Sequence, residues 1–228
     1  MIVGEMVMEP SLQKELLEAT QLKGITLKEV LPDTLYTKVA AWFSANAGME
    51  LRQLHSFSPM VVMTVVMAVT QQKYFPNKPG EVQLDDYFQQ QGRKQGKKVR
   101  GLETMEVQIN ALFRQMSLQR QVVLLNELFG QQSLQEMIGV MNNAYVSQDM
   151  NKLRQLMFEG SYTPGELKVL LTDRNVAWMR QLPGLMKEHS LFVAVGALHL
   201  VGEVGLVEAL RGLGYTVEPV KLRGANVL

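Results

Sequence analysis

The sequence predicts a helix-rich α/β fold with a small, mostly parallel sheet and a large helical insertion. Short apolar runs that suit strands lie far apart, at 2–3, 99–102 and 193–195, and the residues between them show helical spacing. The last run is followed by a helix pattern at 203–213 and another apolar run at 215–220. Strands joined through a helix pair in parallel. We therefore expect a single domain, with 1–8, 97–116 and 163–228 as the α/β core and 9–96 and 117–162 as mainly helical segments.

Composition narrows the function classes. The 228 residues are 46% hydrophobic and 20% charged, which is an ordinary globular balance. The formal net charge of +1 gives no strong field for nucleic acid or an anionic membrane, so neither is an expected partner. The chain has no cysteine, which excludes disulfides, thiolate metal sites and a cysteine nucleophile.

No membrane span is expected. The longest apolar run, PMVVMTVVMAV at 59–69, is well short of the roughly 20 residues that a spanning helix needs. Ser58 and Pro59 suit the cap and first position of a helix, so we interpret the run as a buried helix. The start of the chain lacks a basic-then-apolar leader, so no signal peptide is predicted.

Helix signals follow one another through the first half of the chain. Apolar spacing in 10–24 predicts a helix that ends at Gly24. A capping box formed by Thr26 and Glu29 opens a short helix that Pro32 ends. Further helices are expected over 33–48, 59–69 and 82–96, with a Pro- and Gly-rich loop at 76–81.

The second half begins with the strand at 99–102 and returns to helical spacing at Thr104. Two or three helices are expected over 118–158. Thr163, Pro164 and Glu166 form a strong helix start, with a cap, a proline in the first turn and a glutamate at the third position. We expect that helix to continue to about Lys187, before the last strand, helix and strand.

Acidic and histidine side chains follow the three separated strands. Glu5 follows the first, Glu103 the second, and Gly196 and His199 the third. The carboxyl ends of parallel strands meet at one edge of a sheet, where ligands bind. One imidazole and two carboxylates there suit a divalent cation or acid–base chemistry. Gly196 would allow a turn with positive φ or a close approach of backbone.

Simpler interpretations stand beside this one. A lone histidine after a strand, such as His199, is more often a hydrogen-bonded structural residue than a ligand. Glu103 would offset the positive end of the helix that it precedes. Glu5 would be a surface charge. Arg174 and Asn175 lie in a helix and would be either an exposed pair or part of the site. The cationic run GRKQGKKVR at 92–100 is interpreted as a solvated helix end, because no aromatic residue interrupts it.

Several stretches together resemble the TraB/GumN family, which is related to the TIKI proteins. The closing stretch VAVGALHLVGEVGLVEALRGLGYTVEPV is similar to the family's last motif, and IVGEM, GKKVRGLETMEVQ and RNVAWMRQL match earlier motifs in the same order. LDDYF, with Asp85, resembles the family's Asp-x-Tyr element. The resemblance covers nearly the whole chain, and its specific parts are GALH and GLET.

The resemblance implies two Gly-x-x-His motifs and a glutamate around a divalent metal, such as Mn²⁺, Co²⁺ or Zn²⁺. In TIKI proteins this arrangement supports metal-dependent peptide cleavage, and TraB-type members are linked to shutting down peptide pheromone. When the family's motif positions are transferred to the matching residues of this sequence, the implied metal ligands are His199 and Glu5. Glu103 is then implied as a ligand or general base. The supporting residues are Gly196, Gln108, Arg174 and Asn175. The family also implies an extracytoplasmic or envelope-associated location.

One family motif has no counterpart in this sequence. The first Gly-x-x-His would precede IVGEM, and neither His55 nor His189 has a glycine three residues before it. We therefore expect a chain that lacks the family's first strand and helix, holds a metal more weakly, and exposes a sheet edge that could pair in a homodimer.

Two functions follow as hypotheses. The first is a metal-dependent hydrolase that acts on peptides, either active or inactive in this shortened form. The alternative is a non-catalytic module that binds a peptide or partner in the same cleft. Both use the same residues, so the sequence separates them poorly.

Overall fold

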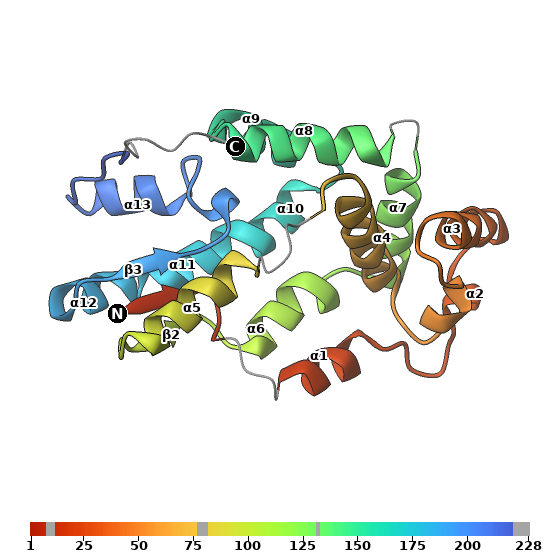
Figure 1. Cartoon of the computed structure of the whole chain (residues 1–228), viewed down its shortest axis with the longest axis horizontal. Coiled ribbons are helices and arrows are strands. Elements are labelled where there is room, and N and C mark those ends of the chain that lie inside the picture. The colour runs from red at the N-terminus through yellow and green to blue at the C-terminus, as the bar shows by residue number, and fades with distance from the viewer. Residues whose placement is uncertain (8–11, 77–81, 131–132, 221–228) are drawn as a thin grey trace.

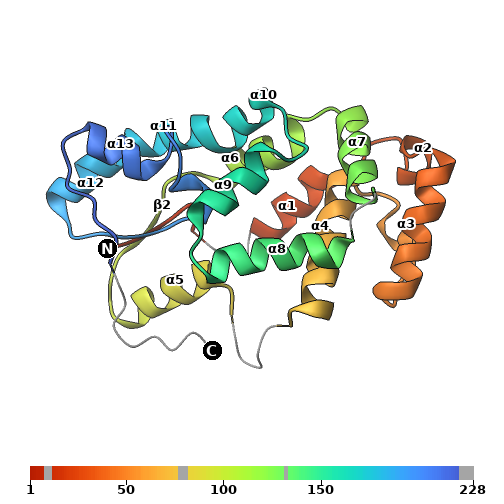
Figure 2. The ribbon, with the colours of Figure 1, turned by 90° about the horizontal axis from the view of Figure 1, so that it is seen from above.

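The computed structural model describes residues 1–7, 12–76, 82–130 and 133–220 (Figure 1). Most of the loop expected at 76–81 lies outside the described residues. A small sheet with its helices occupies one end of the molecule, and a group of helices occupies the other (Figures 1 and 2). The predicted helix-rich α/β class is confirmed.

The sheet has three short parallel strands in the order β2-β1-β3. They are β1 (Ile2–Gly4), β2 (Val99–Gly101) and β3 (Phe192–Ala194). In register, Gly4 lies between Gly101 on one side and Ala194 on the other. All three strands therefore end at the same edge, as the sequence predicted.

Each face of the sheet is covered by helices. Val3 packs with Leu102, Trp178, Leu182 and Leu206, which join the sheet to α11 (Asp173–Met179), α12 (Leu182–Glu188) and α13 (Leu206–Gly212). The neighbouring Ile2 points to the opposite face because side chains alternate along a strand.

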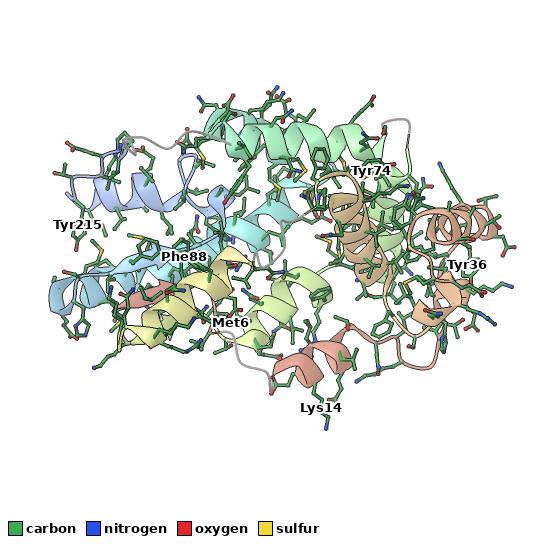
Figure 3. The ribbon with its side chains drawn as sticks, viewed as in Figure 1. Met6, Lys14, Tyr36, Tyr74, Phe88 and Tyr215 are labelled. Carbon is green, nitrogen blue, oxygen red and sulfur yellow. The ribbon has the colours of Figure 1, made fainter. Side chains whose placement is uncertain are left out.

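On that second face lies α5 (Leu84–Lys94). A Cβ at Gly92 would stand only 2.5 Å from Cγ1 of Ile2, so this glycine lets α5 approach the sheet. Phe88 of α5 also contacts Phe192 of β3, with ring centroids 4.7 Å apart, and Figure 3 labels Phe88 beside the sheet.

The other end of the molecule has a core of its own. Its helices are α2 (Leu27–Val30), α3 (Asp33–Asn46), the 3₁₀ helix η1 (Leu51–Leu54), α4 (Pro59–Tyr74), α7 (Leu118–Leu128) and α8 (Leu134–Val146), whereas α1 (Leu12–Thr20) and α9 (Met150–Phe158) contribute no described residue to it. Phe43, Val62, Val66 and Leu125 are among its buried residues. The apolar run at 59–69 thus lies in a helix that packs in this core. In the part of the chain that the structure describes, no helix is both long and apolar enough to cross a membrane.

The helix expected from Thr163 to Lys187 is interrupted. The predicted capping box of Thr163 and Glu166 opens α10 (Pro164–Leu167), but a π-helical turn, η3 (Lys168–Thr172), follows before α11 begins. The chain breaks again before α12, where Pro183 lacks the N–H that a continuous helix requires. A second π turn, η2 (Asn110–Arg114), continues α6 (Met105–Ile109).

The strand expected at 215–220 is absent, so the last predicted strand–helix–strand unit does not form. The segment after α13 pairs with no described strand. Arg211 Nη2 donates instead to the carbonyl of Val217 at 2.8 Å. Apolar alternation alone predicted this strand, whereas a strand also needs a neighbouring edge to bond.

Candidate functional site

The candidate site lies at the edge where the three strands end. Glu5 directly follows β1, and its backbone carbonyl accepts hydrogen bonds from the N–H groups of Leu102 and Glu103 at 3.0 and 2.9 Å. The N–H of Gly196, just after β3, donates to Oε1 of Glu5 at 2.7 Å. Backbone pairing therefore brings together residues that are far apart in sequence.

Arg174 is at the centre of this cluster. Its Nη2 donates to Oε2 of Glu5 and to Oε1 of Glu103, each at 2.6 Å, and its Nε donates to Oε2 of Glu103 at 3.1 Å. Its Nη1 donates to the carbonyl of Leu170 at 3.2 Å and lies 3.0 Å from Nε2 of His199. The guanidinium is nearly buried, and its planar fork binds both carboxylates.

His199 is held in one tautomer by its neighbours. The amide nitrogen of Asn175 donates to the carbonyls of His199 and Val204, so Oδ1 of Asn175 is the acceptor for the N–H of His199 Nδ1 at 2.7 Å. The lone pair of Nε2 then accepts from Arg174. This arrangement presents a neutral imidazole to the carboxylates, with Nε2 3.9 Å from Oε1 of Glu5.

The electrostatics favour that neutral form. Burial, followed by the neighbouring charge of Arg174, lowers the pKa of His199 to about 4, although the negative Glu5 acts in the opposite direction. Burial alone would lower the pKa of Arg174. Its hydrogen bonds and charge interactions with Glu103 and Glu5 outweigh that effect, so the pKa is raised and the guanidinium stays charged.

The two glutamates occupy different environments. The side chain of Glu103 is only 3% exposed, and its Oε2 also accepts a hydrogen bond from Nε1 of Trp178 at 3.1 Å. The side chain of Glu5 is 21% exposed and receives a long contact from Nε2 of Gln108 at 3.4 Å. Glu103 is therefore enclosed, whereas Glu5 is the carboxylate that solvent can reach.

The negative charge of Glu5 also affects a third carboxylate, that of Asp85. Burial, and then the negative charge of Glu5, raise the pKa of Asp85 at the start of α5. Asp85 belongs to the LDDYF stretch that the sequence singled out. The exposed side of the site thus carries excess negative charge, which would attract a cation.

A comparison with protein-family models matches the TraB/PrgY/gumN family over residues 1–219. The chain belongs to the TraB/PrgY/gumN family. No curated protein and no solved structure matches the chain.

The motif residues that the sequence analysis matched to this family lie in one contact network. They are Glu5, Glu103, Gln108, Arg174, Asn175, Gly196 and His199. Gly196 has negative φ, so the expected positive φ is not the reason for a glycine here. The glycine instead lets the carboxylate of Glu5 approach the backbone, because a Cβ there would stand 3.2 Å from Oε1 of Glu5.

Trp178, in the stretch RNVAWMRQL, also belongs to this network. Its ring lies 4.3 Å from the His199 ring and 5.0 Å from the Arg174 guanidinium. The signal in the sequence was its position four residues after Arg174, on the same face of one helix.

In this TraB/PrgY/gumN member, two side chains, those of His199 and Glu5, could together bind a metal ion. His199 offers a neutral nitrogen with its second nitrogen fixed by Asn175, which is the usual support for a metal-binding histidine. Glu5 offers a partly exposed carboxylate. Within the described ranges no group of three or more His, Cys, Asp or Glu side chains is arranged to hold an ion. An ion at Nε2 would also replace the hydrogen bond from Arg174.

Proposed function

We propose that this protein is a hydrolase that acts on peptides and uses a divalent cation, Mn²⁺, Co²⁺ or Zn²⁺, held by His199 and Glu5. The supporting observation is the orientation of His199. Its Nδ1 is fixed by Asn175, and its Nε2 lies 3.9 Å from Oε1 of Glu5. When bound, a divalent cation would supply Lewis acidity that polarises a peptide carbonyl and makes water easier to deprotonate.

The other side chains would position this pair. Glu103 was suggested by the sequence as a ligand or general base, but both of its oxygens already accept hydrogen bonds from Arg174 or Trp178. We therefore assign Glu103 the role of holding Arg174. Arg174 also donates to Oε2 of Glu5 and would compete with an ion for this ligand, whereas the Gly196 N–H fixes the other Glu5 oxygen.

The direct test is to measure Mn²⁺ binding by calorimetry or electron paramagnetic resonance. We expect one site per chain, and we expect His199→Ala and Glu5→Gln each to weaken binding by at least tenfold. His189→Ala is a matched control, because His189 forms a similar pair with Glu188 at 4.0 Å on the surface. Asn175→Leu should weaken binding 10- to 100-fold by releasing the ring of His199.

Catalysis needs a separate test. A peptide library incubated with Mn²⁺ or Co²⁺ should be cleaved, and the cleavage should be lost in Glu5→Gln. Unchanged ion binding in the His199→Ala and Glu5→Gln variants would contradict the assignment of the ligands. Cleavage that persists without ions, or in those variants, would contradict the assignment of the reaction.

The alternative function, a non-catalytic peptide- or partner-binding module, has one observation in its favour. Arg174 already donates hydrogen bonds to both carboxylates and occupies the Nε2 lone pair of His199, so the hydrogen bonds of the network are satisfied without an ion. Peptide binding without cleavage at any ion concentration would favour this module.

A further inference from the structure

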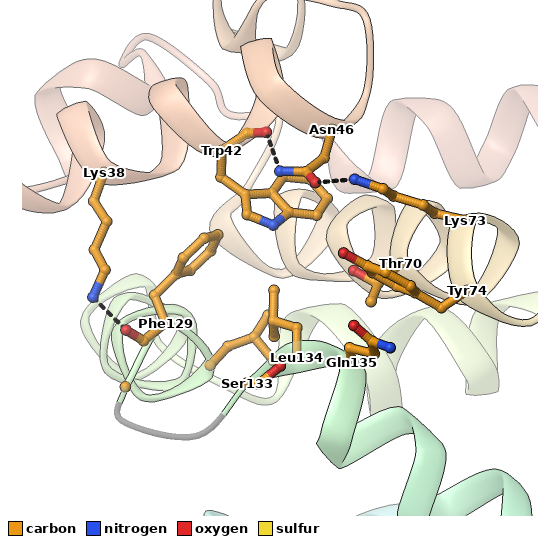
Figure 4. A pocket seen from close by; sticks show the side chains of 12 residues that line it. Lys38, Trp42, Asn46, Thr70, Lys73, Tyr74, Phe129, Ser133, Leu134 and Gln135 are labelled. Atoms are coloured by element: carbon orange, nitrogen blue, oxygen red, sulfur yellow. Dashed lines mark hydrogen bonds between the residues drawn. The ribbon is translucent and has the colours of Figure 1, made fainter.

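A pocket lies in the helical part of the molecule, away from the strand ends. It is a cavity of about 290 Å³ between α3, α4 and the connection from α7 to α8 (Figure 4). That volume is at the lower end of the range for small-molecule sites, so an occupant would be small. None of the residues of the candidate site lines it.

Aromatic rings form much of the wall of this pocket. Trp42 and Phe129 meet edge to face, with centroids 6.1 Å apart and planes at 84°. Tyr74 stands on the other side of the cavity, and Leu134 adds an aliphatic surface (Figure 4). Such walls favour an apolar group that can be withdrawn from water.

The polar groups at the pocket are donors and cations. Lys38 donates to the carbonyl of Phe129, and Lys73 donates to Oδ1 of Asn46 at 2.9 Å. Each ammonium has three N–H groups, so both lysines keep donors for a ligand. No aspartate or glutamate is among the described residues that line the pocket, so these residues give it a positive charge.

Trp42 adds a neutral donor. Figure 4 shows its indole nitrogen on the side of the ring that faces the pocket. Its N–H has no hydrogen-bond partner among the described residues, whereas the indole N–H of Trp178 donates to Glu103. A donor beside apolar walls and two cations suits an acceptor that carries negative charge.

We propose that this pocket binds a small carboxylate attached to an apolar side chain, such as an N-acylated amino acid or the C-terminal residue of a peptide. The apolar group would contact Trp42, Phe129 and Leu134. The carboxylate would pair with Lys38 or Lys73 and accept from the Trp42 N–H. This binding does not depend on the function proposed for the strand-end site.

The probe is N-acetyl-L-phenylalanine, and its C-terminal amide is the uncharged control. The chain has two tryptophans, so the indole N–H region of a ¹⁵N spectrum holds two signals, and Trp42→Phe assigns them. We expect the acid to shift the Trp42 signal to saturation and to leave the Trp178 signal in place. The amide should bind at least tenfold more weakly, because a charge-assisted hydrogen bond is lost.

Charge-removing variants test the recognition. Lys73→Met or Lys38→Met should weaken binding of the acid by about tenfold. Lys28→Met is the matched control, because Lys28 also lies near an aromatic ring, 6.0 Å from the centroid of Tyr36, but outside the pocket. An unchanged Trp178 signal shows that each variant is folded, and Lys73→Met serves if Lys38→Met disturbs the end of α7.

A tripeptide ending in phenylalanine, compared with N-acetyl-L-phenylalanine, distinguishes the two proposed sources, the C-terminal residue of a peptide and an N-acylated amino acid. Tighter binding of either one is consistent with the proposal and identifies the source. Equal binding of the acid and its amide would overturn it. So would the absence of any Trp42 shift at 10 millimolar (about 10 times a typical upper KM), or full affinity in both lysine variants.

Discussion

Replacing Arg174 with methionine tests the central feature of the site. Arg174 is the cation that Glu103 and Glu5 share, and the side chain of Glu103 is only 3% exposed. The variant would leave a buried carboxylate without its partner while keeping an unbranched side chain of similar length. Removing one member of a buried ion pair typically costs about 3–5 kcal/mol, and we expect a loss of stability in that range.

The assay is urea denaturation at pH 7 without added metal, with tryptophan fluorescence as the measure of unfolding. Arg114→Met is the matched control. Arg114 pairs with Glu106 at the same distance of 2.6 Å, but the two side chains are 46% and 63% exposed. Exposed pairs contribute roughly 0–1 kcal/mol, so this control should be nearly neutral.

A double variant separates a lost attraction from an unpaired charge. Arg174→Met combined with Glu103→Leu removes both charges, so it should be more stable than Arg174→Met alone. The reasoning would be refuted if Arg174→Met cost less than about 1 kcal/mol. It would also be refuted if the double variant lost the sum of the two single effects.

Three further predictions concern other parts of the fold. Hydrogen bonding from Arg120, opposed by burial, lowers the pKa of Glu166 to about 2. The stability that this pairing provides is therefore complete above about pH 4.5 and is lost as the pH falls toward 2, so urea denaturation at pH 5 and pH 3 should differ less in Glu166→Gln than in the natural protein. Gly92→Ala should destabilise by about 1–3 kcal/mol, because its Cβ would clash with Ile2, and a melting temperature equal to the natural one would contradict that packing. Gly212→Ala, in a helix with open space around the glycine, should instead stabilise by about 0.5–1 kcal/mol in the same measurement.

The sequence predicted that the residues following the three strands meet at one edge, because two features indicate the same arrangement. Short apolar runs mark β1, β2 and β3, and parallel pairing brings whatever follows them to one edge. Glu5, Glu103 and His199 were therefore expected to meet. The family resemblance added Gln108, which no spacing rule would have selected.

The sequence did not indicate how these groups are connected. Arg174 lies in an ordinary helical pattern, and its central position depends on the π turn η3, which has no clear local signature. Such turns often occur at functional sites in helices. The strand expected at 215–220 failed for a related reason: alternation describes one segment, whereas pairing depends on a second edge.

Arg174 and a divalent cation would compete for the same acceptor. The single lone pair of His199 Nε2 accepts from Nη1 of Arg174 at 3.0 Å, and a metal ion at His199 needs that lone pair. The Arg174→Met variant should therefore change two properties in opposite directions. It should unfold at lower urea, and it should bind Mn²⁺ more tightly than the natural chain because Glu5 and His199 are both released. Weaker Mn²⁺ binding in a folded Arg174→Met protein would mean that Arg174 supports the ion site, and the competition argued from this geometry would be wrong.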